Sequence, residues 1–284
     1  RQSHTGNVLK GQTDRVLAAD FALEQPIDYV KWDMNRQLSD LGSSYLDKDS
    51  QQELFHRYVL GLYKMQERLI TEFPDLLLEN CSGGGARFDP GMLYYSPQIW
   101  CSDDTDAVER LEIQEGTALI YPLSTMGAHV SVCPNHSVGR VTPFETRGHV
   151  ALAGTFGYEL DITKLPEEEH KMIKEQTEMY HKYNDLIREG DYYRIASFSE
   201  NGHYDCYMEV AKDKSEALVT YVQVRGVPNN KSRKFKLQGL DPKAIYQLEG
   251  TEERYSGEIL MKGGYLFKDF WGDAVSRLYH FVRK

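Results

Sequence analysis

Acidic residues at two places in the chain have the types and spacing that bond-breaking chemistry needs. At the first place, Asp33 ends an apolar run and has Lys31 and Asn35 at alternate positions. An extended strand points all three side chains the same way. A neighbouring lysine favours the ionised form of a carboxylate, which then serves as a nucleophile or a ligand. A buried ion pair at a strand end explains the pattern equally well.

The second place follows Trp100, where Asp103, Asp104 and Asp106 occur within four residues. A calcium loop of the EF-hand type is excluded, since its spacing and distal glutamate are missing. We expect Asp106 to cap the helix that follows, which leaves Asp103 or Asp104 as a second catalytic carboxylate. Two carboxylates at the end of one sheet suit glycoside hydrolysis, in which one attacks or stabilises the anomeric carbon and the other protonates the leaving oxygen.

Two further stretches carry polar residues after predicted strands. Consecutive glycines in residues 79–89 allow backbone N–H groups to approach a ligand closely. This stretch lacks the ending of a phosphate-binding P-loop and the spacing of a dinucleotide fingerprint, and a tight turn remains the alternative. His129 and His136 have the side chains of metal ligands, although hydrogen bonding to a neighbouring loop is the commoner role of such histidines.

The elements that position these residues alternate between short apolar strands and helices as far as residue 189. We expect strands at 27–33, 76–78, 98–101, 128–132 and 156–160, and helices at 14–23, 50–73, 107–119, 144–152 and 166–189. Continuous apolar strands between helices predict a parallel sheet that is covered on both faces. A barrel and an open doubly wound sheet both fit, and the carboxyl ends of the strands are the place for catalytic groups.

The pattern changes after Gly190 to short alternating strands separated by turns. We expect them at 192–198, 204–210, 217–224, 234–237, 244–248 and 279–282. The sequence therefore predicts an α/β domain over residues 1–189 and an antiparallel β domain over residues 190–284.

Composition narrows the classes of function. The 284 residues carry 33 Lys and Arg against 43 Asp and Glu, a formal net charge of −10. This balance argues against nucleic-acid partners and anionic membrane surfaces, and no apolar run reaches the length of a membrane span. The N-terminal residues lack the pattern of a signal peptide. Four cysteines without zinc-ligand spacing are expected to be free thiols in a reducing compartment.

Several long motifs, in one order, resemble those of the α-galactosidases of glycoside hydrolase family 36. They are DYVKWDMNR at 28–36, ENCSGGGARFD at 79–89, PQIWCSDDTDA at 97–107, and the segments 127–147 and 157–161. Asp33 and Asp103 lie 70 residues apart, a spacing similar to that of the family. The resemblance is close over roughly residues 27–189, whereas the β domain fits by pattern only.

The resemblance implies the later part of a TIM-type (β/α)8 barrel, from about its fourth strand onward, followed by an antiparallel β-sandwich domain. It implies that Asp33 is the nucleophile and Asp103 the acid/base of a retaining double displacement. The acid/base needs a raised pKa, which a like charge would supply. The substrate-binding residues that it implies are Lys31 and Asn35 at the galactose hydroxyls, Cys81, Gly83 and Gly84 near the 2-hydroxyl, and Trp32, Met34 and Arg36 beside the nucleophile.

The implied substrates are galactoside oligosaccharides such as melibiose and raffinose, with no metal or organic cofactor. Full-length bacterial relatives are commonly cytoplasmic homotetramers, so we expect a cytoplasmic bacterial protein that forms a homo-oligomer. Family members have a further N-terminal β-sandwich domain and earlier barrel units, which residues 1–26 do not match, and Ala86 replaces a glycine that is often found in the family's loop. We therefore expect a truncated α-galactosidase that alone is weakly active or inactive, and that is poorly stable or dimerises.

Two alternatives remain open at this point. A non-catalytic sugar-binding remnant would explain the missing pocket residues, but the intact Asp33 and Asp103 disfavour it. A relative that transfers galactose, or one that hydrolyses α-N-acetylgalactosaminides, would keep the fold and change the reaction. Cys81 near the 2-position favours a hydroxyl over a bulky acetamido group.

Overall fold

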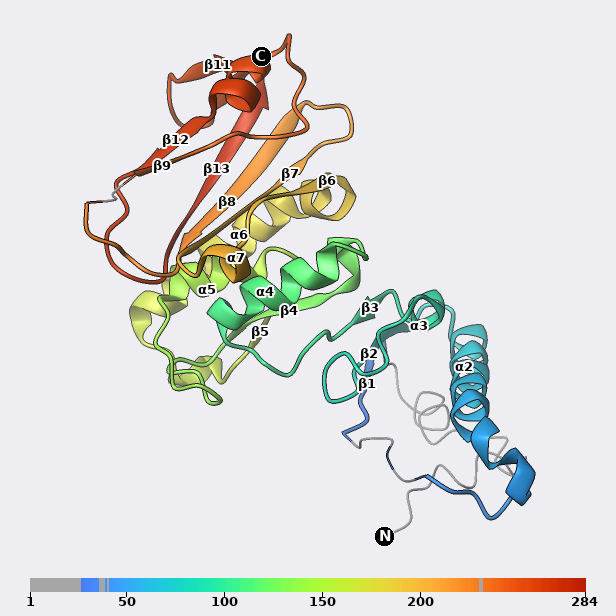
Figure 1. Ribbon diagram of the computed structural model, residues 1–284. Coiled ribbons are helices and arrows are strands. Elements are labelled where there is room, and N and C mark those ends of the chain that lie inside the picture. The colour runs from blue at the N-terminus through green and yellow to red at the C-terminus, as the bar shows by residue number, and fades with distance from the viewer. Residues whose placement is uncertain (1–26, 36–38, 40, 230–231) are drawn as a thin grey trace. The chain divides into compact units, whose positions relative to one another are not determined.

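The computed structural model describes residues 27–35, 39, 41–229 and 232–284, which form two compact units (Figure 1). The first unit ends at Trp100 and the second runs from Cys101 to Lys284. The helix expected at 14–23, and Arg36, lie outside the described residues. Each unit is described by itself.

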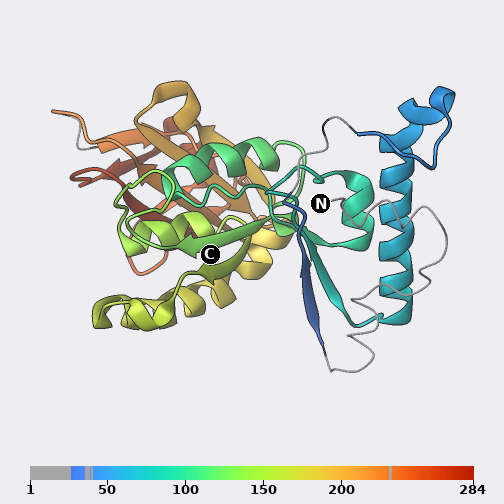
Figure 2. The same cartoon turned by 90° about the horizontal axis from the view of Figure 1, so that it is seen from below.

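The first unit is built on a parallel sheet with the strand order β1-β2-β3. Figure 2 shows α2 running along one side of this sheet. Leu69 of α2 packs there against Leu76 and Leu78, with Val30 and Trp32 partly buried beside them. The elements are β1 (Tyr29–Trp32), η2 (Lys48–Glu53), α2 (Leu54–Glu72), β2 (Leu77–Asn80), α3 (Pro90–Tyr95) and β3 (Gln98–Ile99).

Alternation along the strands places the polar side chains of the first unit on the other face of its sheet. Lys31 is the register partner of Glu79, and its ammonium lies over the ring of Trp100. The predicted strands and the long helix are confirmed. The short helix α3, which the sequence analysis missed, begins at Pro90 with Asp89 as its cap.

The second unit begins with two further strand–helix pairs, in which β4 and β5 pair in parallel. Val130 of β4 packs against Phe144 and Ala151 of α5. The helices and strands expected here begin and end within a residue or two of those observed. The elements are α4 (Ala107–Ala118), η3 (Leu123–Thr125), β4 (Gly127–Ser131), α5 (Phe144–Ala151), β5 (Thr155–Glu159), η4 (Ile162–Lys164) and α6 (Glu167–Glu189).

The C-terminal part of the second unit is the predicted antiparallel β region. Its six-stranded sheet has the order β11-β10-β13-β8-β7-β6, and β9 pairs with β12. The sequence analysis missed β11 and β12, and it predicted only part of β13. The elements are β6 (Asp191–Ala196), α7 (Phe198–Asn201), β7 (Tyr204–Val210), β8 (Glu216–Gln223), β9 (Ser232–Phe235), β10 (Ile245–Leu248), β11 (Arg254–Ser256), the π-helical turn η5 (Ile259–Gly263), β12 (Tyr265–Lys268) and β13 (Val275–Arg283).

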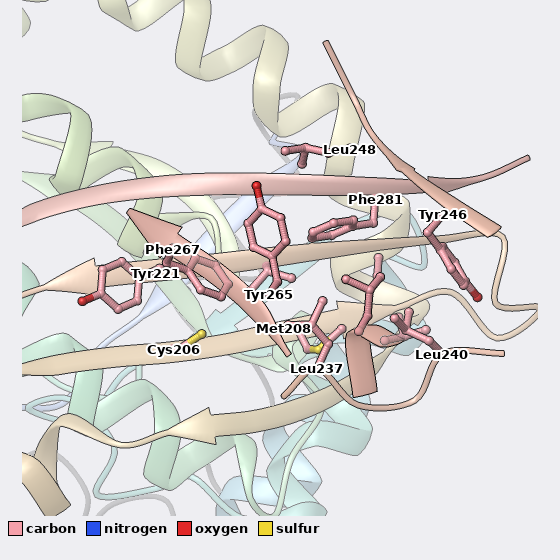
Figure 3. Close-up of a cluster of buried hydrophobic side chains, with 14 of the residues drawn as sticks. Cys206, Met208, Tyr221, Leu237, Leu240, Tyr246, Leu248, Tyr265, Phe267 and Phe281 are labelled. Carbon is pink, nitrogen blue, oxygen red and sulfur yellow. The ribbon is translucent and has the colours of Figure 1, made fainter. Parts of the chain in front are cut away.

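One face of the six-stranded sheet holds an aromatic core. Figure 3 shows Tyr265 between Phe267 and Phe281, with ring centroids 5.2 and 5.3 Å away. Met208 of β7 is fully buried in the same cluster. Edge-to-face contacts of this kind favour one defined packing of the rings.

The opposite face of the sheet packs against helices of the same unit. On β7, Asp205, Tyr207 and Glu209 point to the side away from the aromatic core. Helix α5 lies between β4 and the six-stranded sheet, as Figure 1 shows. The hydroxyl of Thr146 on α5 donates a hydrogen bond to the carbonyl of Ala274, which precedes β13, over 2.7 Å. The helices therefore hold this sheet through a partly polar contact.

The parallel strands form a three-stranded and a two-stranded sheet in the part of the chain that the structure describes. Closure of these strands into one barrel, and a domain boundary between residues 189 and 190, stay predictions. None of the described helices is both long and apolar enough to span a membrane.

Candidate active site

Asp33 lies just after β1, where its carboxylate accepts hydrogen bonds from its own chain segment. Oδ1 accepts from the backbone N–H of Met34 over 2.7 Å, and Oδ2 accepts from Nδ2 of Asn35 over 2.9 Å. The alternation predicted for Asp33 and Asn35 therefore brings the two side chains into contact. Both remain exposed, so a ligand can reach the carboxylate.

The pKa of the Asp33 carboxyl is lowered from its usual value. Burial raises it, but hydrogen bonds from the side chains of Cys81 and Asn35 and from the backbones of Met34 and Gly83 together outweigh burial. The hydrogen bonds that lower this pKa were not predicted from the sequence, which offered Lys31 as the neighbour that favours the ionised form. The ammonium of Lys31 lies instead 3.4 Å from Oε1 of Glu79.

The glycine loop that follows β2 brings backbone donors to Asp33. Gly83 and Gly84 have φ angles of +53° and +83°, which side-chain-bearing residues rarely adopt. The N–H of Ser82 donates to the carbonyl of Gly84 over 2.8 Å, which closes the turn. The N–H of Cys81 donates to the carbonyl of Trp32 over 2.9 Å. The loop is thereby fixed beside the end of β1.

Trp32 and Met34 lie on the helix side of the strand end. Trp32 packs with the core residues around α2, and the hydroxyl of Tyr58 contacts Sδ of Met34 at 3.0 Å. Alternation therefore separates them from Lys31 and Asp33, and they support the strand from behind. Whether either residue contacts a sugar stays a prediction.

The sequence analysis gave no role to Arg87, which joins the ends of two strands. Its Nη2 donates to the carbonyl of Trp32 over 3.1 Å and to that of Cys81 over 2.5 Å. Arg87 is 9% exposed, so these charge-assisted bonds form away from water. Its place in the glycine motif was the signal available, but no spacing rule links an arginine there to strand ends.

The three aspartates near the start of α4 have different surroundings. Asp106 accepts from the N–H groups of Val108 and Glu109 over 3.1 Å each and pairs with Arg140, so its predicted capping role is confirmed. Oδ1 of Asp104 accepts from the N–H of Asp106 over 3.0 Å. Asp103 is exposed. The structure thus uses Asp104 to shape the turn and leaves Asp103 facing solvent.

His129 lies on β4 beside Gly157 of β5, and its Nδ1 is 3.6 Å from Oε2 of Glu159. In the described residues, no group of three or more His, Cys, Asp and Glu side chains is arranged to hold a metal. The four cysteines carry free thiols.

Two family models match most of the chain. The model described as Melibiase matches residues 8–190, and the model of the glycosyl hydrolase family 36 C-terminal domain matches residues 204–281. This chain belongs to glycoside hydrolase family 36. The resemblance seen in the motifs is confirmed, but its expected limits were wrong. The first model begins at residue 8, within the stretch that was expected not to match, and the second covers most of the β domain, which had fitted by pattern only.

Relatives in family 36 are α-galactosidases. Alpha-galactosidase AgaA of Geobacillus stearothermophilus is 50% identical over 254 residues, which cover 89% of this chain and 35% of AgaA. Alpha-galactosidase Mel36A of Lactobacillus acidophilus is 48% identical over 256 residues, or 90% of this chain and 35% of Mel36A. The crystal structure of AgaB from Geobacillus stearothermophilus matches with a TM-score of 0.90 and 48% identity, over 94% of this chain and 37% of AgaB. The chain thus spans about a third of the length of these relatives.

Proposed function

We propose that this chain carries the catalytic aspartates of a retaining α-galactosidase that removes terminal α-linked galactose from oligosaccharides such as melibiose and raffinose. Asp33 is the nucleophile and Asp103 the acid/base. The observation that carries the proposal is the hydrogen bonding around Asp33. Four donors lower its pKa while the carboxylate stays exposed, which suits a group that must be ionised and reachable.

The proposed reaction has two displacements. An oxygen of Asp33 attacks the anomeric carbon while Asp103 gives its proton to the leaving oxygen, which forms a β-galactosyl ester on Asp33. Asp103 then takes a proton from water, which attacks the same carbon and releases α-galactose. The donors around Asp33 keep its carboxylate oriented, so less reorganisation is needed at the moment of attack. Neither displacement requires a cofactor.

The proposed sugar contacts follow from the residues around the nucleophile. Lys31 and Asn35 bind galactose hydroxyls, and Cys81, Gly83 and Gly84 line the pocket near the 2-hydroxyl. Support comes from the loop contacts that bring Cys81 and Gly83 to Asp33. The role of Arg36 rests on the sequence motif alone.

The relatives supply independent support. AgaA has been crystallised with raffinose and with stachyose, in each case with one aspartate replaced in addition to a shared substitution. The two replaced aspartates are as far apart in that chain as Asp33 and Asp103 are in this one. This agreement favours the same pair as the catalytic carboxylates.

The same proposal includes a requirement for the remaining strands of the catalytic barrel. The chain spans about a third of its relatives, so we expect full activity only when the strands of the remaining barrel are supplied. A domain boundary at residues 189 and 190, assembly into a homo-oligomer and a cytoplasmic bacterial location are further predictions of the family resemblance.

A chimera tests the proposal. The matched third of AgaA is replaced by this chain, and hydrolysis of p-nitrophenyl α-galactoside is measured for the chimera and for Asp33→Ala and Asp103→Ala. Asp33→Ala should lose activity, and added azide should then give β-galactosyl azide. In Asp103→Ala, azide should instead give α-galactosyl azide, because attack occurs on the β-galactosyl ester. An Asp33→Ala chimera as active as its parent would refute the assignment.

A further inference from the structure

Glu79 is a buried acid of the first unit that forms an ion pair with a lysine. It lies on β2 directly beside Lys31 of β1, and its Oε1 is 3.4 Å from Nζ of Lys31. The side chain of Glu79 is 2% exposed and that of Lys31 is 33% exposed. A buried carboxylate is costly without a partner. The ion pair therefore holds the ammonium of Lys31, while part of the Lys31 side chain stays exposed to solvent.

The ring of Trp100 supports the same ammonium. Nζ of Lys31 lies 4.8 Å from the ring centroid of Trp100, within the range of a cation–π contact. Trp100 is buried, so its ring position is fixed by packing. A lysine side chain has a flexible four-carbon stem and loses much freedom when it is held. Here the buried carboxylate of Glu79 and the buried ring of Trp100 both hold the ammonium of Lys31 in place.

The Glu79–Lys31 pair precedes the proposed nucleophile, Asp33, along the paired strands. Asp33 comes two residues after Lys31, just past the end of β1, and Cys81 comes two residues after Glu79, just past the end of β2. The thiol of Cys81 hydrogen-bonds Asp33. The cross-strand pair of Glu79 and Lys31 is thus followed, just past the ends of the two strands, by the contact between Cys81 and Asp33.

We propose that Glu79 is a positioning residue of the sugar site, which fixes the ammonium of Lys31 where it meets a hydroxyl of a sugar bound at Asp33. This inference rests on the proposed function, because it takes the sugar to bind beside Asp33. Without the charge of Glu79, the ammonium of Lys31 samples other positions, and the sugar contact is lost although Lys31 itself remains.

The test compares affinity for 1-deoxygalactonojirimycin, an iminosugar that AgaA has been crystallised with. Titration calorimetry is carried out on the full chain, Glu79→Gln, Lys31→Met and the double variant. Glu115→Gln is the matched control, because Glu115 is a buried acid 3.0 Å from Arg194 in the second unit. Glu79→Asp keeps the charge but shortens the reach, and carries the test if Glu79→Gln does not fold.

Glu79→Gln should weaken binding about tenfold, in the range of measured couplings between contacting residues. Glu79→Asp should weaken it less, and Glu115→Gln should leave it unchanged. In the Lys31→Met background, Glu79→Gln should add nothing. A loss that persists in that background, or wild-type affinity in Glu79→Gln, overturns the proposal because Glu79 would then not act through Lys31.

Lysine acylation gives a readout that does not depend on sugar binding. The rate at which an N-hydroxysuccinimide ester modifies Lys31 is followed by peptide mass spectrometry in the wild type, Glu79→Gln and Glu79→Asp. Release of the ammonium should speed this reaction several-fold in Glu79→Gln. If the wild-type chain binds no iminosugar, the sugar site itself fails in this chain. An unchanged acylation rate overturns the role of Glu79 separately.

Discussion

The thiol of Cys81, the residue that follows β2, donates a hydrogen bond to the carboxylate of Asp33. Burial, with a further contribution from Asp33, raises the pKa of this thiol to about 11. The thiol therefore stays protonated at neutral pH and remains a donor. The Cys81 thiol is thus one of the donors that favour the ionised form of the proposed nucleophile.

Replacing this donor should change the ionisation of the nucleophile. Cys81→Ala removes one of the hydrogen bonds that lower the pKa of Asp33, so that pKa should rise. Carbon-13 NMR titration of the aspartate carboxyl groups measures the change in the full chain. Cys81→Ser keeps a hydroxyl donor at the same place and should retain the wild-type value. An Asp33 titration that is identical in Cys81→Ala and wild type would contradict the role of the thiol.

Asp106 should be a major stabiliser of the second unit. Asp106→Ala removes the cap of α4 and the partner of Arg140, and should lower the free energy of unfolding by about 2 kcal/mol. Urea unfolding followed by circular dichroism measures this. Asp106→Asn keeps the capping oxygen without its charge and should lower the free energy of unfolding by less than Asp106→Ala does. Equal losses in the two variants would show that the cap contributes little.

His149 should make stability depend on acid pH. Burial lowers its pKa from 6.5 to about 4, while its Nδ1 lies 2.7 Å from Oγ of Ser276. The unfolded chain binds a proton between these values and the folded chain does not, so stability is lost as pH falls from about 6.5 to about 4. The loss from this group between pH 7 and pH 5 should be about 2 kcal/mol.

The measurement for His149 is urea unfolding of the wild type and His149→Gln at pH 7 and pH 5. Relative to the wild type, the unfolding free energy of His149→Gln should be about 2 kcal/mol higher at pH 5 than at pH 7. A difference that does not change with pH would show that His149 is accessible to protons in the folded state.

Glu209 should give stability the opposite pH dependence to that of His149, with a loss as pH rises. Burial raises the pKa of its carboxyl from 4.5 to about 8, and neither oxygen has a hydrogen-bond partner on another described residue. Its neutral form is compatible with the fold, so stability is complete below about pH 4.5 and is lost as pH rises towards 8. Asp205 on the same face of β7 has a pKa raised to about 7 by burial, which adds to this dependence.

Glu209→Gln should remove the part of this dependence that belongs to Glu209. Between pH 4.5 and pH 7 the unfolding free energy of the variant should gain about 3 kcal/mol relative to the wild type. Chemical unfolding across this range measures the gain. Parallel pH profiles for the two proteins would mean that Glu209 is ionised at little cost in the folded chain.

Local signals explain which parts of the fold were predictable. Periodicity located the helix after Asp106, and the acid at its start identified its cap. Short strands with distant partners were not found: β12 pairs with β9 across a long stretch of chain, and the turn residues Gly263 and Gly264 before it mark a turn without indicating the strand that follows. Pairing of this kind is decided by packing of the aromatic core, which no local pattern reports.

The contacts of the candidate site were likewise predictable only where they are local in the sequence. Alternation alone predicted that Asn35 accompanies Asp33, because both lie on one strand end. The ion pair between Lys31 and Glu79 was not predicted, because Glu79 lies across the sheet and alternation along one strand does not report cross-strand partners. Sequence spacing could not separate Asp103 from Asp104, whereas the hydrogen bond from Asp106 to Asp104 shows which of them shapes the turn.

Covalent trapping tests the central claim most directly. The chimera of this chain with the remaining two thirds of AgaA is incubated with 5-fluoro-α-galactosyl fluoride, digested, and analysed by mass spectrometry. A retaining mechanism forms an ester on the nucleophile, so the peptide that contains Asp33 should gain one fluorogalactosyl group and Asp33→Ala should gain none. A label on any other residue, or a chimera that hydrolyses α-galactosides without labelling Asp33, would contradict Asp33 as the nucleophile.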